Sequence, residues 1–62
     1  MTAKDILPNL NQIVSYKNKL YKLTGVMIRK DENGNVYYIA EIKDLNAKSS
    51  FCWVRLEEVD IG

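Results

Sequence analysis

Acidic side chains are the first candidates for chemistry in this sequence. Three carboxylates stand close together in Glu57-Glu58-Val59-Asp60, and two more directly precede the Asn-Gly pair of Asp31-Glu32-Asn33-Gly34-Asn35. Clustered carboxylates serve acid–base catalysis or calcium binding. The second segment lacks the ligand spacing and the closing glutamate of a calcium loop, so it predicts a hairpin turn. The first segment is typical of a solvated surface.

Sulfur and imidazole chemistry is limited by composition. The chain has one cysteine, Cys52, and no histidine, so the usual zinc ligand sets and an internal disulfide are excluded. Cys52 stands in an apolar run, which predicts a small buried side chain and not a reactive thiol. The sequence has no glycine-rich phosphate loop and no nucleophile with an evident base nearby. We therefore expect no metal, no cofactor and no catalysis.

Size and charge narrow the class of protein further. The chain has 62 residues and a net charge of +1, from nine basic and eight acidic residues. One domain of this size leaves little room for a substrate pocket, and so small a net charge gives no long-range attraction to nucleic acid or anionic lipid. No apolar run is long enough for a membrane helix or a secretory signal peptide. With a single cysteine, these features predict a cytoplasmic domain that does not contact a membrane.

Two kinds of element must position the remaining side chains. Residues 1–11 predict a short helix, because Thr2 and Asp5 have the spacing of a capping box and Pro8 limits the helix to one or two turns. Residues 12–62 are rich in β-branched and aromatic residues and predict strands. We place the strands at 13–16, 20–30, 36–43 and 49–55, with a helical turn at 56–59 and a closing strand at 60–62.

Turn and bend signals separate the predicted strands. Lys17-Asn18 is a tight turn, the segment 31–35 centres on Asn-Gly, and residues 44–48 form the next loop. Gly25 interrupts the long second strand, which predicts a β-bulge or a sharp bend.

The strand 49–55 has large apolar side chains on both faces, although a half-buried strand needs only one apolar face. A symmetric pairing across each loop places Ile28 opposite Tyr38 and Ile39 opposite Trp53. One face then holds a mainly apolar set, the predicted core, which comprises Val26, Ile28, Val36, Tyr38, Ala40, Ile42, Cys52 and Val54. The other face holds nearly every charge of these strands together with a second apolar group.

That second group predicts a contact surface. Its members lie side by side on three neighbouring strands and comprise Met27, Arg29, Tyr37, Ile39, Phe51, Trp53 and Arg55. An aromatic centre with an arginine rim is typical of an interface. The sequence leaves three possibilities for what covers this surface. They are the apolar side chains of the N-terminal helix, Ile6, Leu7 and Leu10; a second copy of the chain, giving a homodimer; or a different protein.

Basic residues offer an alternative function. Lys17, Lys19 and Lys22 cluster around the first turn, and cations interleaved with aromatic side chains can hold phosphates and stack bases. Charged residues also protect the edges of sheets from other strands. We therefore keep weak binding of single-stranded nucleic acid as an alternative that is less favoured than protein binding.

The order of these segments resembles an SH3-like small β-barrel. The resemblance covers about residues 12–61 and is carried by Val14-x-Tyr16, Lys19-x-Tyr21-x-Leu23, two hairpins and Val54-Arg55-Leu56-Glu57-Glu58-Val59. It implies five strands and a 3₁₀ turn before the last strand, which would be Leu56-Glu57-Glu58-Val59. The pattern is common in short bacterial and phage-type accessory proteins. The Ala-Leu-Tyr-Asp-Tyr-like signature of eukaryotic SH3 domains is absent, so binding of proline-rich peptides is not implied.

The sequence thus predicts a single mainly β domain over residues 1–62, a helix over 1–11 followed by an SH3-like five-stranded barrel over 12–62. We expect a non-catalytic protein-interaction module, without metal or cofactor, whose partner is another protein or a second copy of the chain.

Overall fold

The computed structural model describes residues 1–46 and 50–62. The elements, in chain order, are η1 (Ala3–Asp5), α1 (Ile6–Asn9), β1 (Ile13–Tyr16), β2 (Lys19–Lys30), β3 (Val36–Asp44), β4 (Phe51–Arg55), η2 (Leu56–Glu58) and β5 (Asp60–Ile61). The predicted short helix, the strands and the 3₁₀ turn are confirmed. The predicted start of the fourth strand at Ser49, and residues 47 and 48 of the predicted loop, lie outside the described residues.

The N-terminal helical segment begins where the capping signal predicts it. The Asp5 carboxylate accepts hydrogen bonds from the backbone N–H and the hydroxyl of Thr2, both at 2.9 Å. The helix ends at Asn9 because Leu10 is extended and Asn11 has a φ of 65°. Seven residues from Ala3 to Asn9 make the segment too short to persist alone, so it depends on packing against the sheet.

Two tight turns connect the strands of the two hairpins. Lys17 and Asn18 both have positive φ, 50° and 62°, as the twist of a two-residue hairpin requires. In the second hairpin Gly34 has a φ of 84°, and its N–H donates to the carbonyl of Asp31 at 3.0 Å. The Asp31 carboxylate accepts from the N–H groups of Asn33 and Asn35, both at 2.9 Å. The hairpin turn predicted for this segment is confirmed.

A β-bulge at Gly25 decides how the long strand β2 uses its two faces. Leu23 pairs with Ile42 and Gly25 pairs with Glu41, so Thr24 is an extra residue in the ladder. The Thr24 hydroxyl donates to Oε1 of Glu41 at 2.7 Å. Because one residue is added, Leu23 is buried and Val26 also packs on the core, although they are three positions apart. The bulge predicted at Gly25 is confirmed.

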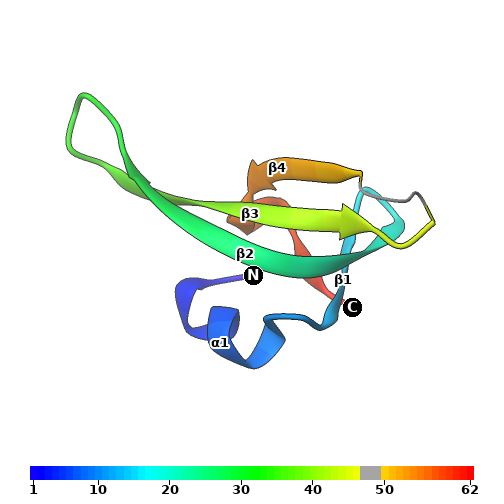
Figure 1. The fold of residues 1–62 in the computed structure, drawn as a ribbon. Coiled ribbons are helices and arrows are strands. Elements are labelled where there is room, and N and C mark those ends of the chain that lie inside the picture. The colour runs from blue at the N-terminus through cyan, green and yellow to red at the C-terminus, as the bar shows by residue number, and fades with distance from the viewer. Residues whose placement is uncertain (47–49) are drawn as a thin grey trace.

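The five strands form one antiparallel sheet in the order β4-β3-β2-β1-β5, and this sheet is not closed as a barrel. The predicted barrel is therefore wrong, and the resemblance to SH3-like barrels is not confirmed. The physical reason is that β4 and β5 are opposite edges of the sheet, and β5 has only two residues with which to extend the ladder. The N-terminal segment takes the place of barrel closure, because it lies against one face of the sheet (Figure 1).

The core lies on that covered face, which we call the inner face. Its buried side chains are Val14, Tyr21, Leu23, Ala40, Ile42, Leu56 and Val59. Ile6 and Leu10 pack against this core from the N-terminal segment, together with Met1, whose amino group donates to the Val59 carbonyl at 2.8 Å. The inner face is thus closed by the N-terminal segment and by the residues that follow β4.

The hairpin of β2 and β3 extends beyond this core (Figure 1). Ile28 and Val36 were predicted to be core residues, yet their side chains are 70% and 57% exposed. Their face is as predicted, but they lie at the margin of the segments that cover the inner face, where Val36 lines a surface cavity with Met1, Thr2 and Ala3. Tyr38, the direct cross-strand partner of Ile28, does pack against the core with its larger side chain. Alternation therefore predicts the face correctly, while the length of the hairpin decides how far burial extends.

Candidate interaction surface

The pairing of β3 with β4 differs from the predicted register by two residues. Trp53 lies opposite Glu41, and Ile39 lies opposite Arg55, where Ile39 opposite Trp53 was predicted. The Asp44 N–H donates to the carbonyl of Ser50 at 3.0 Å, so Asp44, which was predicted to begin the loop, still belongs to the ladder. A shift of two residues keeps every side chain on its predicted face, whereas a shift of one would have reversed the faces.

The predicted contact residues therefore share one face of the sheet, which we call the outer face. They form what we call the outer patch: Met27, Arg29, Tyr37, Ile39, Phe51, Trp53 and Arg55. Three large apolar members are open to solvent: Phe51 is 40%, Met27 41% and Trp53 58% exposed. The Phe51 and Trp53 rings are stacked, with centroids 6.4 Å apart and planes 30° apart. The outer patch is thus an apolar surface with an ordered aromatic pair on β4.

Arginines border the patch toward the projecting hairpin. Met27 pairs with Ile39 and Arg29 pairs with Tyr37 across β2 and β3, as the sequence predicts. The Arg55 guanidinium lies over the Tyr37 ring, 4.2 Å from its centroid, within the range of a cation–π contact. A stacked guanidinium keeps donors free for a partner while its carbon atoms cover part of the ring.

The N-terminal helix does not cover the outer patch. Ile6 and Leu10 pack against the core on the inner face, and the Leu7 side chain is 81% exposed. The interpretation in which Ile6, Leu7 and Leu10 cover the patch is therefore wrong. The helix has only one apolar stripe, and the chain directs that stripe to the inner face. The two interpretations that need a second molecule stay predictions.

The three lysines of the alternative function do not share one face. Lys19 points to the inner side and forms a salt bridge with the buried Asp44, with Nζ and Oδ2 2.5 Å apart. This hydrogen bond raises the pKa of Lys19 above its ordinary value. Lys17 lies in the first turn, 5.4 Å from the centroid of the Tyr16 ring. Only Lys22 lies on the outer face, because side chains alternate along β2.

Lys22 has a neighbour that reasoning from sequence clusters missed. Lys43 pairs directly with Lys22 across β2 and β3, and its ammonium lies 5.9 Å from the centroid of the Phe51 ring. The signal was present in the sequence, since the hairpin register across residues 31–35 places Lys43 on the outer face. Only the exact continuation of that ladder past the Gly25 bulge shows that the two lysines are opposite each other.

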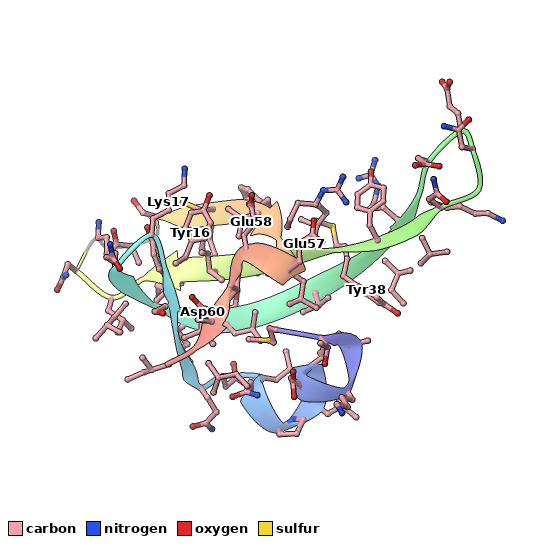
Figure 2. All side chains as sticks on the ribbon, turned by 180° about the vertical axis from the view of Figure 1, so that it is seen from behind. Tyr16, Lys17, Tyr38, Glu57, Glu58 and Asp60 are labelled. Carbon is pink, nitrogen blue, oxygen red and sulfur yellow. The ribbon has the colours of Figure 1, made fainter. Side chains whose placement is uncertain are left out.

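Basic and acidic side chains lie on different parts of the molecule. The outer face of β2, β3 and β4 carries four cations, Lys22, Arg29, Lys43 and Arg55. It carries one carboxylate, Glu41, which accepts a hydrogen bond from the Thr24 hydroxyl. Glu57, Glu58 and Asp60 come from η2 and β5, the segment after β4 (Figure 2). The small net charge of the chain therefore conceals a basic outer face.

A shallow cavity lies on the inner side, at the base of the projecting hairpin. It has a volume of about 160 Å³ and is lined by Met1, Thr2, Ala3, Val36, Tyr37, Tyr38, Arg55, Leu56 and Glu57. Tyr38 points from β3 toward the N-terminal segment (Figure 2). Small-molecule sites usually measure about 300 Å³ or more. This cavity is therefore a weaker candidate for a binding site than the outer patch.

Comparison with known proteins supplies no relative. No protein family, curated protein or solved structure matches this chain. Over residues 1–46 and 50–62, no helix is long and apolar enough to cross a membrane, and no group of acidic, cysteine or histidine side chains is placed to hold a metal ion.

Proposed function

We propose that this protein is a small non-catalytic interaction module that binds another protein or a second copy of itself through the outer patch. The observation that carries the proposal is the exposure of Met27, Phe51 and Trp53 on one face that the N-terminal helix leaves open. Burying these side chains would drive association, and aromatic and arginine side chains contribute most to binding energy at interfaces. Arg29 and Arg55 would set the orientation of the partner.

The proposal includes a setting and a kind of protein. An unpaired cysteine, Cys52, half-buried in β4, fits the reducing cytoplasm. A short domain with an exposed candidate interaction face fits an accessory protein of bacterial or phage type. The resemblance to SH3-like barrels is one of fold pattern alone and adds nothing to the choice of partner.

A capture experiment tests the role of the outer patch. The tagged chain is used as bait in a lysate of the cells that encode it, and its own mass is measured by sedimentation. We expect Trp53→Ala to abolish capture of a partner, or self-association, while circular dichroism stays unchanged. The matched control is Ile28→Ala, which removes an exposed apolar side chain from the opposite face and should bind as the unaltered chain does.

Two results would contradict this function. Capture and mass that are the same for Trp53→Ala and for the unaltered chain would remove the outer patch from the interaction. Loss of the folded state in Trp53→Ala would show that Trp53 stabilises the domain itself, against the 58% exposure of its side chain.

One observation favours a second candidate, weak binding of single-stranded nucleic acid. Lys22 and Lys43 lie directly opposite each other beside Phe51, and like charges in that position are destabilising unless an anion lies between them. A phosphate held by the two lysines would let a base stack on Phe51 or Trp53.

Fluorescence anisotropy with a labelled single-stranded oligonucleotide tests this second function. Binding should weaken steeply as salt rises, because lysine–phosphate contacts release counterions. Lys22→Gln with Lys43→Gln should remove binding, whereas Lys17→Gln with Lys19→Gln should leave it unchanged. No binding at low salt, or equal loss in both double variants, would exclude a phosphate site between Lys22 and Lys43.

A further inference from the structure

The strand β4 is an edge of the sheet, and its backbone shows which groups are left to pair. The hydrogen bond from Asp44 N–H to Ser50 C=O marks these two residues as a hydrogen-bonded pair. Such pairs alternate along an antiparallel ladder, so Cys52 and Val54 are the next residues of β4 to direct their N–H and C=O groups toward β3. The alternate residues of β4 direct their N–H and C=O groups outward, away from β3.

The outward-facing residues are Phe51, Trp53 and Arg55. Their backbone donors and acceptors face the open edge, and their side chains form the β4 part of the outer patch. One row of residues therefore offers a backbone ladder and an aromatic surface at the same time. A partner that adds a strand at this edge would satisfy the backbone groups and bury the aromatic pair together.

The two edges of the sheet are protected to different degrees. Proteins usually block an exposed edge with lysine, proline or a very short strand. The β5 edge has this protection, since it consists of Asp60 and Ile61 alone. Strand β4 has five residues, no lysine, no proline and a single charge at Arg55. The open edge is therefore suited to pairing with another strand.

We propose that the strand which pairs with this edge is β4 of a second copy of the chain, a proposal that rests on the proposed function and names its partner. Antiparallel pairing about a twofold axis at Trp53 places this residue opposite its own copy. Phe51 then lies opposite Arg55, and Arg55 opposite Phe51. Because the same three residues face outward in both copies, every outward backbone group in β4 gains a hydrogen-bond partner.

The side chains match in this register as well. Each Arg55 lies next to the Phe51 ring of the second copy, where its cation can interact with the ring face. The two Trp53 side chains become cross-strand neighbours, an arrangement that stabilises antiparallel pairs. No like charges meet across the axis. The β4 sequence is thus complementary to itself, as a twofold interface requires.

The geometry also limits the assembly to two copies. Each chain has one β4 edge, and the twofold operation uses the same edge on both chains. The remaining edges of the joined sheet are the short β5 strands and the projecting part of the β2–β3 hairpin, which neither β1 nor β4 covers and which carries Arg29 and Lys30. A closed dimer follows, in which the outer patches of both chains form one continuous face.

Analytical sedimentation of the intact chain provides the test. We expect the mean mass to rise from one copy to two as concentration increases. Trp53→Lys and Trp53→Glu should each raise the dissociation constant about 100-fold, because residue 53 then meets its own charge across the axis. An equimolar mixture of the two variants should recover the dimer mass, since lysine then faces glutamate. Ile28→Lys, a change of an exposed side chain on the opposite face and away from β4, should leave the dimer intact.

Hydrogen exchange of the unaltered chain gives a second readout that needs no variant. The N–H groups of Phe51, Trp53 and Arg55 should exchange fast in dilute solution and slowly at concentrations where the dimer forms. Those of Cys52 and Val54 should exchange slowly in both, because they already face β3. Equal exchange of both sets at all concentrations would overturn the proposed pairing.

The outcomes separate this proposal from the proposed function. A single-copy mass at every concentration would overturn the dimer, whereas Trp53-dependent capture of a different protein would still support an interaction module. A dimer that survives both charged variants, or a mixture that stays monomeric, would overturn the β4 register. If there is neither dimer nor Trp53-dependent capture, both proposals fail.

Discussion

The two faces of the β-sheet both carry large apolar side chains, but the chain covers only one of them. On the inner face Leu23 and Ile42 are fully buried beneath the N-terminal segment and the residues after β4. On the outer face Phe51 and Trp53 stay open to solvent in a setting of arginines and lysines. Apolar content therefore does not distinguish the faces; the presence of charge and the position of the cover do.

Few elements lie outside the sheet, which limits how many of its faces can be covered. Within the described residues, 1–46 and 50–62, five strands take up most of the chain, and the N-terminal helical segment and the 3₁₀ turn η2 are the elements that can cover the sheet. Both are used on the inner face. Small domains bury a modest share of their surface, so a second apolar face must find its cover in another molecule or stay exposed.

The largest expected effect comes from opening the inner face. Leu23→Ala removes a fully buried side chain and should lower the free energy of unfolding by about 2–5 kcal/mol, enough to unfold much of so small a domain. Met27→Ala, on the outer face of the same strand, should change it by less than about 1 kcal/mol. Urea denaturation followed by circular dichroism measures both. Equal losses would mean that the two faces are buried alike.

A smaller loss of stability should show which side of the N-terminal helix packs on the inner face. Leu10 packs against the core, so Leu10→Ala should cost about 1–2 kcal/mol, in proportion to its partial burial. Leu7 is 81% exposed, and Leu7→Ala should change stability by no more than about 0.5 kcal/mol. The same urea titration compares them. A larger loss for Leu7 than for Leu10 would show that the helix turns its other side to the sheet.

The smallest expected change in stability concerns the Thr2–Asp5 cap at the start of the N-terminal helical segment. Hydrogen bonds from the Thr2 backbone N–H and then from its hydroxyl hold the pKa of Asp5 below its ordinary value of 3.8. A carboxyl group with a lowered pKa in the folded state adds stability above the pKa of the unfolded chain, and this stability is lost as pH falls through the folded pKa.

Melting temperatures across pH test this cap. Asp5→Asn should melt below the unaltered chain at pH 7, and the difference should shrink as pH falls below the ordinary value of 3.8 and through the lowered pKa of Asp5. Asp31, whose pKa is lowered first by the hydrogen bond from the Asn35 backbone, titrates in both proteins and cancels in the comparison. A difference that is constant across pH would show that the charge of Asp5 adds nothing to the cap.

Local patterns explain why much of the fold was predictable. Alternation along β2, β3 and β4 assigned the faces correctly, and Asn-Gly in the turn and Gly25 in the strand marked a hairpin and a bulge. Face assignment survived the error in the β3–β4 register because the error was two residues, which preserves parity. The same reasoning brought the outer patch together from three strands, although the partners of Trp53 and Ile39 were wrong.

Other features depend on where separate segments meet. Ile28 and Val36 have the pattern of core residues, but they lie at the margin of the covering segments and stay exposed. Lys19 and Lys22 are close in sequence, yet they point to opposite faces, and Lys19 is paired with Asp44 from the end of β3. Spacing along one strand carries no information about such distant partners.

The sequence by itself determined which side chains share a face, because alternation in a strand is a local property of the backbone. It also determined the turns, the bulge and the short capped helix. Only the tertiary structure decided that the sheet stays open and that the helix lies on the inner face. Both depend on long-range packing of short segments, whose direction no local pattern specifies. That choice of side is the reason why Phe51 and Trp53 remain available at the open edge.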